Sequence, residues 1–155
     1  MNDPQWLDER EQCLWRTWRQ MYTDLDTALD RELAQESGLS GADYAVLVPL
    51  SEAPDGRLRA RELRTEAGWD RSRIAHQLRR MEKRGLLVRE DCTEDARGTM
   101  ASLTAAGREA IEAAAPGHVA AVRRYFIDQL TDTEVDTLRE VAERVLKRLR
   151  DAETG

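Results

Sequence analysis

The chain has 155 residues, enough for one domain of ordinary size with helical extensions and too few for a third unit. Hydrophobic residues make up 41% and charged residues 35%, a composition typical of a globular protein rich in surface helix, which excludes a disordered chain. The net charge of -6 argues at first against a nucleic-acid partner, because Lys and Arg drive the binding of phosphates.

The positive charge is nevertheless concentrated in the middle of the chain. Residues 57–97 hold 12 Lys and Arg against 8 Asp and Glu, a local net charge of +4, whereas the rest of the chain carries -10. A basic middle between acidic ends indicates a module that faces nucleic acid on an acidic scaffold. The alternative for the same residues is an ordinary solvated surface, in which the acids balance the arginines.

The sequence shows neither a membrane span nor a metal-ligand pattern. No stretch approaches the roughly 18 uninterrupted apolar residues that span a bilayer, and the N-terminus MNDPQWLDEREQ lacks a signal pattern, so we expect a cytoplasmic protein with no membrane partner. Cys13 and Cys92 lie far apart, and His76 and His118 are the only histidines, so neither a disulfide framework nor zinc-ligand spacing is present. We therefore expect no cofactor and no structural metal.

Two helices are predicted in the first third of the chain. Between residues 8 and 35, apolar side chains recur at three- and four-residue steps, which is the pattern of a long amphipathic helix. The stretch SGAD at 40–43 resembles a capping box and predicts the start of a second helix, which Pro49 should kink because it removes a backbone donor. The stretch PDG at 54–56 then predicts a turn.

A helix-turn-helix pattern with a hairpin follows. Short helices are predicted at about 59–66 and 70–84, with Asp70 as the N-cap of the second. The stretches LLVRE at 86–90 and MASL at 100–103 are strand-like and can pair as a hairpin. This order predicts a winged helix-turn-helix in which the hairpin is the wing.

Two more helices are predicted after the wing. Thr104 should cap a long helix toward about residue 130, which Pro116-Gly117 would kink or break, and a capping box at 131–134 opens a last helix. The terminal helices carry more apolar surface than the winged core could cover, so we expect them to pack against a second copy of the chain.

The elements together predict one mainly α (α+β) domain over residues 1–155. Residues of about 40–103 form the winged helix-turn-helix core with its two-stranded wing, and residues of about 8–35 and about 104–150 form long dimerisation helices.

The predicted 70–84 helix has a buried face and an exposed face. Ile74, Leu78 and Met81 recur at i, i+4 and i+7, which fixes the buried side. The opposite side begins with short side chains and becomes basic. A recognition helix needs this order, because its early turns approach base edges while its later Arg and Lys reach phosphates.

Several side chains in this region are predicted to contact DNA. Arg73 favours guanine and Gln77 favours adenine, while His76 is as readily an ordinary surface histidine as a base contact. The predicted contacts are Arg59, Ser72, Arg73, His76, Gln77, Arg79, Arg80 and Lys83.

The predicted hairpin carries Asp95 and Arg97 beside Gly98. A wing next to the recognition helix would project toward the flanking minor groove, where narrow A·T-rich steps attract an arginine. We therefore predict that Arg97 contacts DNA there and that Asp95 holds its direction by a hydrogen bond. The alternative role of Asp95 is to stabilise the turn.

The core combines several short motifs in a fixed order: LRRMEKRGLLVR at 78–89, DARG at 95–98, Leu103-Thr104 and Gly107. In this order and spacing the core resembles the MarR family of bacterial transcriptional regulators. The resemblance implies a homodimer that dimerises through its N- and C-terminal helices, binds a pseudo-palindromic operator, usually represses, and releases DNA when a small molecule or an oxidant acts.

The same resemblance assigns roles to individual residues. Asp95 and Arg97 match the family's wing pair, and residues 72–80 match its recognition helix. Pro49 departs from the pattern, as does Arg59, because the family often has a hydroxyl residue at that position.

Candidate effector and redox sites are less specific. Trp15, Trp18 and Trp69 could form an aromatic effector pocket, although aromatic residues at helical spacing more often belong to a core or a dimer interface. Cys13 lies near the start of the first long helix, where an oxidant-sensing branch of the family has its reactive cysteine, and this match is one of position alone. We therefore expect Cys13 to be an inert buried thiol, because a reactive thiol needs a lowered pKa and access to solvent.

The sequence therefore predicts a DNA-binding transcriptional regulator, most simply a homodimeric repressor released by a small-molecule effector. One alternative is a non-specific architectural DNA-binding protein, and another is an oxidant-sensing repressor that uses Cys13. An enzyme is not expected, because no nucleophile–base pair, phosphate-binding glycine loop or metal-ligand cluster is found in the sequence.

Overall fold

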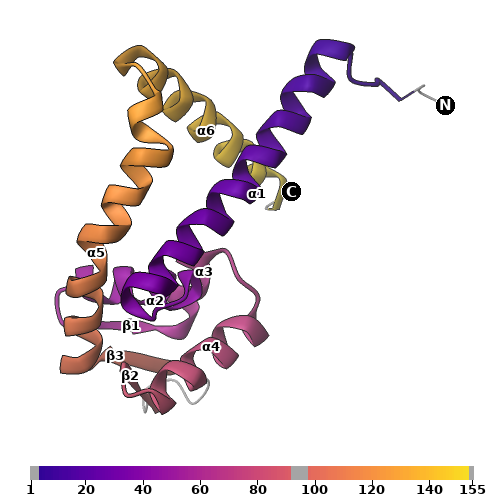
Figure 1. Ribbon diagram of the computed structural model, residues 1–155. Helices are drawn as coiled ribbons and strands as arrows, with labels where there is room; N and C mark the ends of the chain where they lie inside the picture. The colour runs from indigo at the N-terminus through magenta and orange to yellow at the C-terminus, as the bar shows by residue number, and fades with distance from the viewer. Residues whose placement is uncertain (1–3, 92–97, 154–155) are drawn as a thin grey trace. The chain divides into compact units, whose positions relative to one another are not determined.

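The structure is a computed structural model that describes residues 4–91 and 98–153 (Figure 1). The chain divides after His118 into two compact units. The first unit contains α1 (Glu9–Ser37), α2 (Gly41–Glu52), β1 (Arg57–Arg59), α3 (Ala60–Ala67), α4 (Arg71–Lys83), β2 (Leu87–Asp91), β3 (Thr99–Leu103) and the first part of α5 (Ala105–Tyr125). The second contains the end of α5, the 3-10 helix η1 (Ile127–Gln129) and α6 (Asp132–Glu153). The first unit has the predicted winged helix-turn-helix order.

Capping side chains decide where two helices of the core begin. At α2, the Ser40 hydroxyl accepts from the Asp43 N–H at 3.0 Å, and the Asp43 carboxylate accepts from the Ser40 N–H at 2.9 Å. At α4, the Asp70 carboxylate accepts from the Arg73 N–H at 2.8 Å. Both caps confirm the prediction, and α2 continues through Pro49, so this proline does not end the helix.

The wing strands pair as predicted, and a third strand joins them. β2 and β3 are antiparallel, with Val88 opposite Ser102. β1 pairs antiparallel with the other edge of β3, with Leu58 opposite Ala101, so the strand order is β1-β3-β2. The predicted two-stranded wing is therefore confirmed, and the sheet contains a third strand that was not predicted. Three residues are too few to show the alternation of a strand, which is why the sequence does not predict β1.

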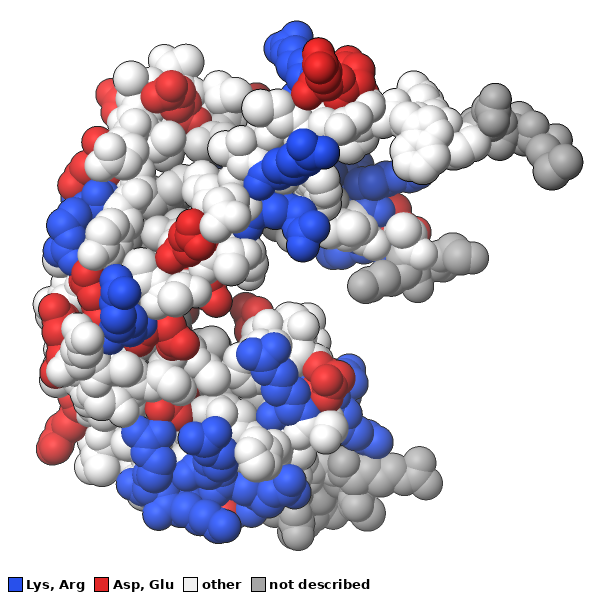
Figure 2. All heavy atoms as spheres, turned by 45° about the vertical axis from the view of Figure 1, so that its right-hand side comes forward, with Lys and Arg blue, Asp and Glu red and all other residues white. Residues whose placement is uncertain are grey.

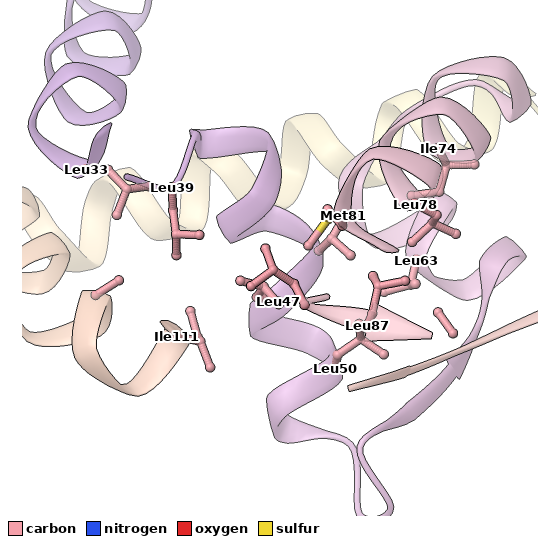
Figure 3. Close-up of a cluster of buried hydrophobic side chains, with 14 residues drawn as sticks. Leu33, Leu39, Leu47, Leu50, Leu63, Ile74, Leu78, Met81, Leu87 and Ile111 are labelled. Carbon is pink, nitrogen blue, oxygen red and sulfur yellow. The ribbon is translucent and has the colours of Figure 1, made fainter. Parts of the chain in front are cut away.

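An apolar core lies between the helices and the sheet of the first unit (Figure 3). Leu47 of α2 and Leu87 of β2 are fully buried in it. Ile74, Leu78 and Met81 are at most 3% exposed, which confirms the predicted buried side of α4. The opposite side of this helix is thereby fixed toward solvent.

Gly107 permits a close approach at the start of α5. The Thr104 hydroxyl accepts from the Gly107 N–H at 3.0 Å and donates to the Gly85 carbonyl at 2.6 Å, so Thr104 acts as the predicted cap. A Cβ on Gly107 would lie 1.9 Å from the carbonyl oxygen of Leu86, far inside van der Waals contact. The Thr-x-x-Gly start therefore packs α5 directly against the segment that leads into β2.

The second unit has the predicted helices with one shifted end. α5 runs without a break through Pro116-Gly117, and it ends at Tyr125 rather than near residue 130, where η1 follows. The Thr131 N–H and hydroxyl both donate to the Glu134 carboxylate at 2.8 Å, which confirms the cap of α6. None of the described helices is long and apolar enough to cross a membrane.

Candidate nucleic-acid interface

The exposed face of α4 carries mostly basic side chains. Figure 2 shows Lys and Arg gathered on the lower part of the view, at the level where Figure 1 places α4. The exposed residues of this helix include Arg71, Ser72, Arg73, His76, Arg79, Arg80 and Lys83. Apart from Gln77, every contact predicted on this helix is therefore on its exposed face.

Arg73 is held at the N-terminal end of α4 by an aromatic ring. Its guanidinium carbon lies 4.3 Å from the centre of the Trp69 ring, a cation–π contact. Trp69 belongs to the turn between α3 and α4 and is half-buried. The turn of the helix-turn-helix thus restricts the direction of one predicted base-reading side chain.

Gln77 does not face solvent, so its prediction as an adenine contact is wrong for this structure. It is 7% exposed, and its amide nitrogen donates to a carboxylate oxygen of Asp43 at 2.7 Å. The sequence contains the signal that could have placed it: Gln77 is three residues after Ile74 and four before Met81, so it shares their face of the helix.

An arginine-lined cleft of about 810 Å³ lies between α3, α4 and the wing strands. Ile74, Ala75 and Leu78 contribute apolar lining, and Gly98 and Thr99 line it from the start of β3. Its basic lining residues are Arg59, Arg61, Arg64, Arg71 and Arg89. Only Arg59 among these was predicted as a DNA contact, although all five belong to the basic 57–97 stretch.

Arg59 also begins α3 with an incomplete cap. Its N–H donates to the Glu62 carboxylate at 2.7 Å, but its own side chain has no acceptor for the helix. The hydroxyl that the family often has here would complete a capping box. This chain instead places a guanidinium at the rim of the cleft.

An ion pair joins the wing to α4. Glu82 accepts from Arg89 through three bonds, from the backbone N–H at 2.9 Å, from Nε at 2.9 Å and from Nη2 at 2.7 Å. The Arg89 hydrogen bonds hold the pKa of Glu82 below its usual value. Because Arg89 belongs to β2, the pair fixes the base of the wing against α4. The predicted wing residues Asp95 and Arg97, and Cys92, lie outside the described residues.

Of the three tryptophans considered as a possible pocket, only Trp69 lines a cleft with other aromatic side chains. Trp15 and Trp18 are exposed on α1, at 55% and 42%. Trp69 instead lines a cleft of about 710 Å³ in the first unit, together with side chains of α1, α2, α4 and α5. Other lining residues are Tyr22, Asp26, Asp30, Tyr44, Arg73 and His118, and neither Trp15 nor Trp18 is among them.

His118 brings a half-buried imidazole to this second cleft. Its ring centre lies 4.2 Å from that of Tyr44, and its Nδ1 is buried without a hydrogen-bond partner among the described residues. Burial lowers the pKa of His118, because desolvation disfavours the charged ring. Arg73 lines the same cleft, so the cleft contacts α4 directly.

Cys13 is exposed on α1, so its prediction as a buried thiol is wrong. Within the described part of the chain, no group of three or more His, Cys, Asp or Glu side chains is arranged to hold a metal ion.

Comparisons with known proteins agree with this geometry. A family profile described as MarR family matches residues 37–98. Over 111 residues, the chain is 31% identical to the HTH-type transcriptional repressor YetL of Bacillus subtilis (strain 168), and this match spans 70% of the chain but just under two thirds, 66%, of that relative.

Solved structures resemble the chain over most of its length. AbsC, a MarR family transcriptional regulator from Streptomyces coelicolor, is 39% identical with a TM-score of 0.90, covering 96% of this chain and 99% of that one. Sco3205, a MarR family transcriptional regulator from Streptomyces coelicolor solved in complex with DNA, is 42% identical with a TM-score of 0.91, covering 94% and 92%. CouR from Rhodococcus jostii RHA1, bound to p-coumaroyl-CoA, is 28% identical with a TM-score of 0.70, covering 82% and 87%.

Proposed function

The chain belongs to the MarR family of transcriptional regulators, and on this premise we propose that it is a homodimeric repressor that binds a pseudo-palindromic operator. Family membership makes it a regulator rather than an enzyme. The observation that carries the proposal is α4, a helix buried on its apolar side whose opposite side presents arginines around Ser72 and His76. The repressor role is supported by the relative YetL, which is a transcriptional repressor.

In the proposed complex, α4 enters the major groove. Ser72, Arg73 and His76, near its N-terminal end, face base edges, while Arg79, Arg80 and Lys83 reach phosphates. The arginine-lined cleft receives a backbone phosphate, because guanidinium groups bind phosphate oxygens in pairs of hydrogen bonds. Arg97, with Asp95 as its partner, remains our proposed minor-groove contact.

Dimerisation is supported by apolar side chains that each unit leaves exposed. On α1 they include Leu14, Trp15, Trp18, Met21 and Tyr22, and on α6 they include Val141, Val145, Leu146 and Leu149. Exposed apolar surface on this scale is typical of an interface. We propose that both helices pack against a second copy of the chain, as predicted from the sequence.

A small-molecule effector fits the cleft that contains Trp69, Tyr44 and Arg73, since it combines aromatic walls with polar groups. An effector there would release DNA by binding more tightly to a dimer whose recognition helices no longer match successive major grooves. Oxidant sensing through Cys13 has less support, because exposure alone does not make a thiol reactive.

A matched pair of variants tests the interface. We expect Arg79→Ala to weaken binding to the preferred duplex by about 1 kcal/mol or more, because it removes a predicted contact with DNA. Arg139→Ala removes the same charge from α6, where Arg139 pairs with Glu143 at 3.1 Å, and should leave the affinity unchanged. Titrations at one salt concentration measure both. Equal affinities for Arg79→Ala and the unaltered chain would contradict the assignment of α4.

A further inference from the structure

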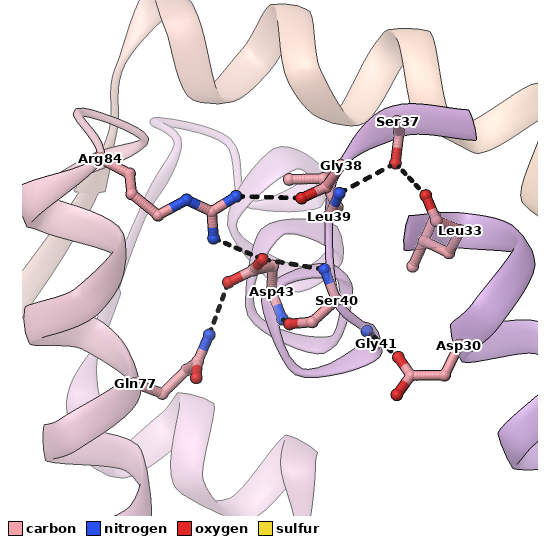
Figure 4. A network of polar contacts seen from close by, with 10 residues as sticks. All are labelled: Asp30, Leu33, Ser37, Gly38, Leu39, Ser40, Gly41, Asp43, Gln77 and Arg84. Carbon is pink, nitrogen blue, oxygen red and sulfur yellow. Dashed lines mark hydrogen bonds and ion pairs between the residues drawn. The ribbon is translucent and has the colours of Figure 1, made fainter. Parts of the chain in front are cut away.

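Asp43 is a buried carboxylate that contacts the recognition helix twice. It is 3% exposed, at the start of α2. One oxygen accepts from the Gln77 amide at 2.7 Å, and the other accepts from the Arg84 guanidinium at 2.6 Å and from the Ser40 N–H at 2.9 Å (Figure 4). Every bond is charge-assisted, and the three donors belong to three different residues, one in the middle of α4, one at its C-terminal end and one at the N-cap of α2.

The two side-chain donors define the direction of one helix. Gln77 lies in the middle of α4 and Arg84 is its C-cap residue, so the anchors are two turns apart, about 10 Å along the axis. Two anchors on one fixed carboxylate restrict both the tilt of a helix and its rotation about its own axis. A rotation would move Gln77 away from Asp43 and would carry the exposed face with it.

The same carboxylate ties α4 to the corner between α1 and α2. Arg84 also donates to the carbonyl of Gly38, the C-cap residue of α1, at 3.3 Å. Ser40, which shares the capping box with Asp43, lines the cleft that contains Trp69. The recognition helix is therefore anchored to the element that follows α1 rather than to the wing alone.

Stability alone does not require such an arrangement. Replacing a buried ion pair with well-packed apolar residues is often neutral or stabilising, and the neighbouring core is already apolar. What a buried polar contact provides is a unique geometry, because any other arrangement leaves a polar group unpaired. The function of α4 depends on such a unique geometry, since its side chains must meet base edges together.

We propose that Asp43 is a positioning residue for sequence-specific DNA binding, which sets the rotation of α4 through Gln77 and Arg84 without contacting DNA itself. The inference rests on the proposed function as an operator-binding regulator. It predicts that loss of an anchor reduces operator affinity while affinity for unrelated DNA persists, because phosphate contacts tolerate a rotated helix and base contacts do not.

Gln77→Met tests the middle anchor without changing charge or side-chain length greatly. We expect its affinity for the preferred duplex to fall by at least about tenfold, the size of one good base contact. Its affinity for an unrelated duplex should stay within about twofold, and the salt dependence of binding should be unchanged, because no phosphate contact is lost. Selection from a random pool should show weakened preference at several positions of each half-site.

Arg84 provides a second test at a side chain that is 40% exposed, so its replacement leaves no cavity in the core. Arg84→Met should lower operator affinity as Gln77→Met does, and Arg84→Lys, which keeps the ion pair with Asp43, should restore most of it. If Arg84 instead bound a phosphate, Arg84→Met would reduce the salt slope by about 1 and would weaken binding to all duplexes alike.

The outcomes separate the explanations. If Gln77→Met lowers only the stability to unfolding and keeps the ratio of specific to unrelated affinity, the contact is merely structural and the proposal is wrong. If preference is lost at a single base pair, Gln77 reads that base directly and the proposal is also wrong. If Gln77→Met does not fold, the two Arg84 variants decide. If the unaltered chain binds all duplexes with equal affinity, the proposed function as an operator-binding regulator is wrong, and the role of Asp43 is wrong with it.

Discussion

At the scale of single residues, Asp43 shows how a buried charge is kept ionised. Burial raises the pKa of its carboxyl, but the hydrogen bonds from Arg84 and Ser40 and the Arg84 charge outweigh burial, so the pKa lies below the ordinary value of 3.8. A carboxyl with a depressed folded pKa stabilises the fold above its unfolded pKa, and this contribution is lost as the pH falls through the folded pKa.

The Arg84→Met variant should therefore lose stability in a pH-dependent way. At neutral pH it leaves Asp43 buried without its cation, and we expect a loss of about 1–3 kcal/mol in the free energy of unfolding. The difference from the unaltered chain should shrink as acid protonates Asp43, first in the variant, whose carboxyl has the higher pKa. Urea unfolding of both proteins at a series of decreasing pH values, at one protein concentration, measures this difference in the free energy of unfolding. A difference independent of pH would contradict this account, and Arg139→Met serves as the surface control.

At the scale of elements, spacing in the sequence predicts those features that depend on local chemistry. The caps at Ser40, Asp70 and Thr131 and the apolar face of α4 follow from residue types a few positions apart, and the structure confirms them. β1 and the contact of Gln77 with Asp43 depend on residues more than thirty positions away. No local pattern encodes such partners, which is why the sequence alone leaves them out.

Gly107 gives a prediction for one element. Gly107→Ala should destabilise the fold by about 1–3 kcal/mol or more, because its Cβ would overlap the Leu86 carbonyl and rigid backbone cannot yield. Gly117→Ala, on the same helix, should be neutral or stabilising. There the Cβ meets only the flexible carboxylate of Glu36, and alanine favours the helix by up to about 1 kcal/mol. Thermal unfolding compares the stability of the two variants. An equal loss of stability in both would argue against the close approach at Gly107.

At the scale of the whole molecule, the regulator is proposed to work only as a dimer. In this proposal, one recognition helix on one half-site gives little affinity. In a dimer, once one helix has bound, the binding of the second helix to its half-site is intramolecular and therefore favoured. The exposed apolar face of α6 is where this requirement can be tested without touching the winged core.

We expect Val145→Glu to weaken dimerisation and to reduce operator affinity by at least about tenfold, because a charge would be buried in the interface. Val145 is 54% exposed in the single chain. Lys147→Glu introduces the same side chain away from this apolar face and should leave the dimer intact. Sedimentation across a range of concentrations measures the assembly. A Val145→Glu variant that remains dimeric would show that α6 does not form the interface.

The most direct test of the central claim is selection of bound duplexes from a random DNA pool at physiological salt, followed by footprinting of the enriched sequence. We expect one protected site with two-fold symmetry and half-sites about one helical turn apart, because two α4 helices of a dimer must reach successive major grooves on one side of the duplex. A folded dimer that binds DNA with steep salt dependence but enriches no sequence would contradict the claim and would indicate a non-specific architectural protein.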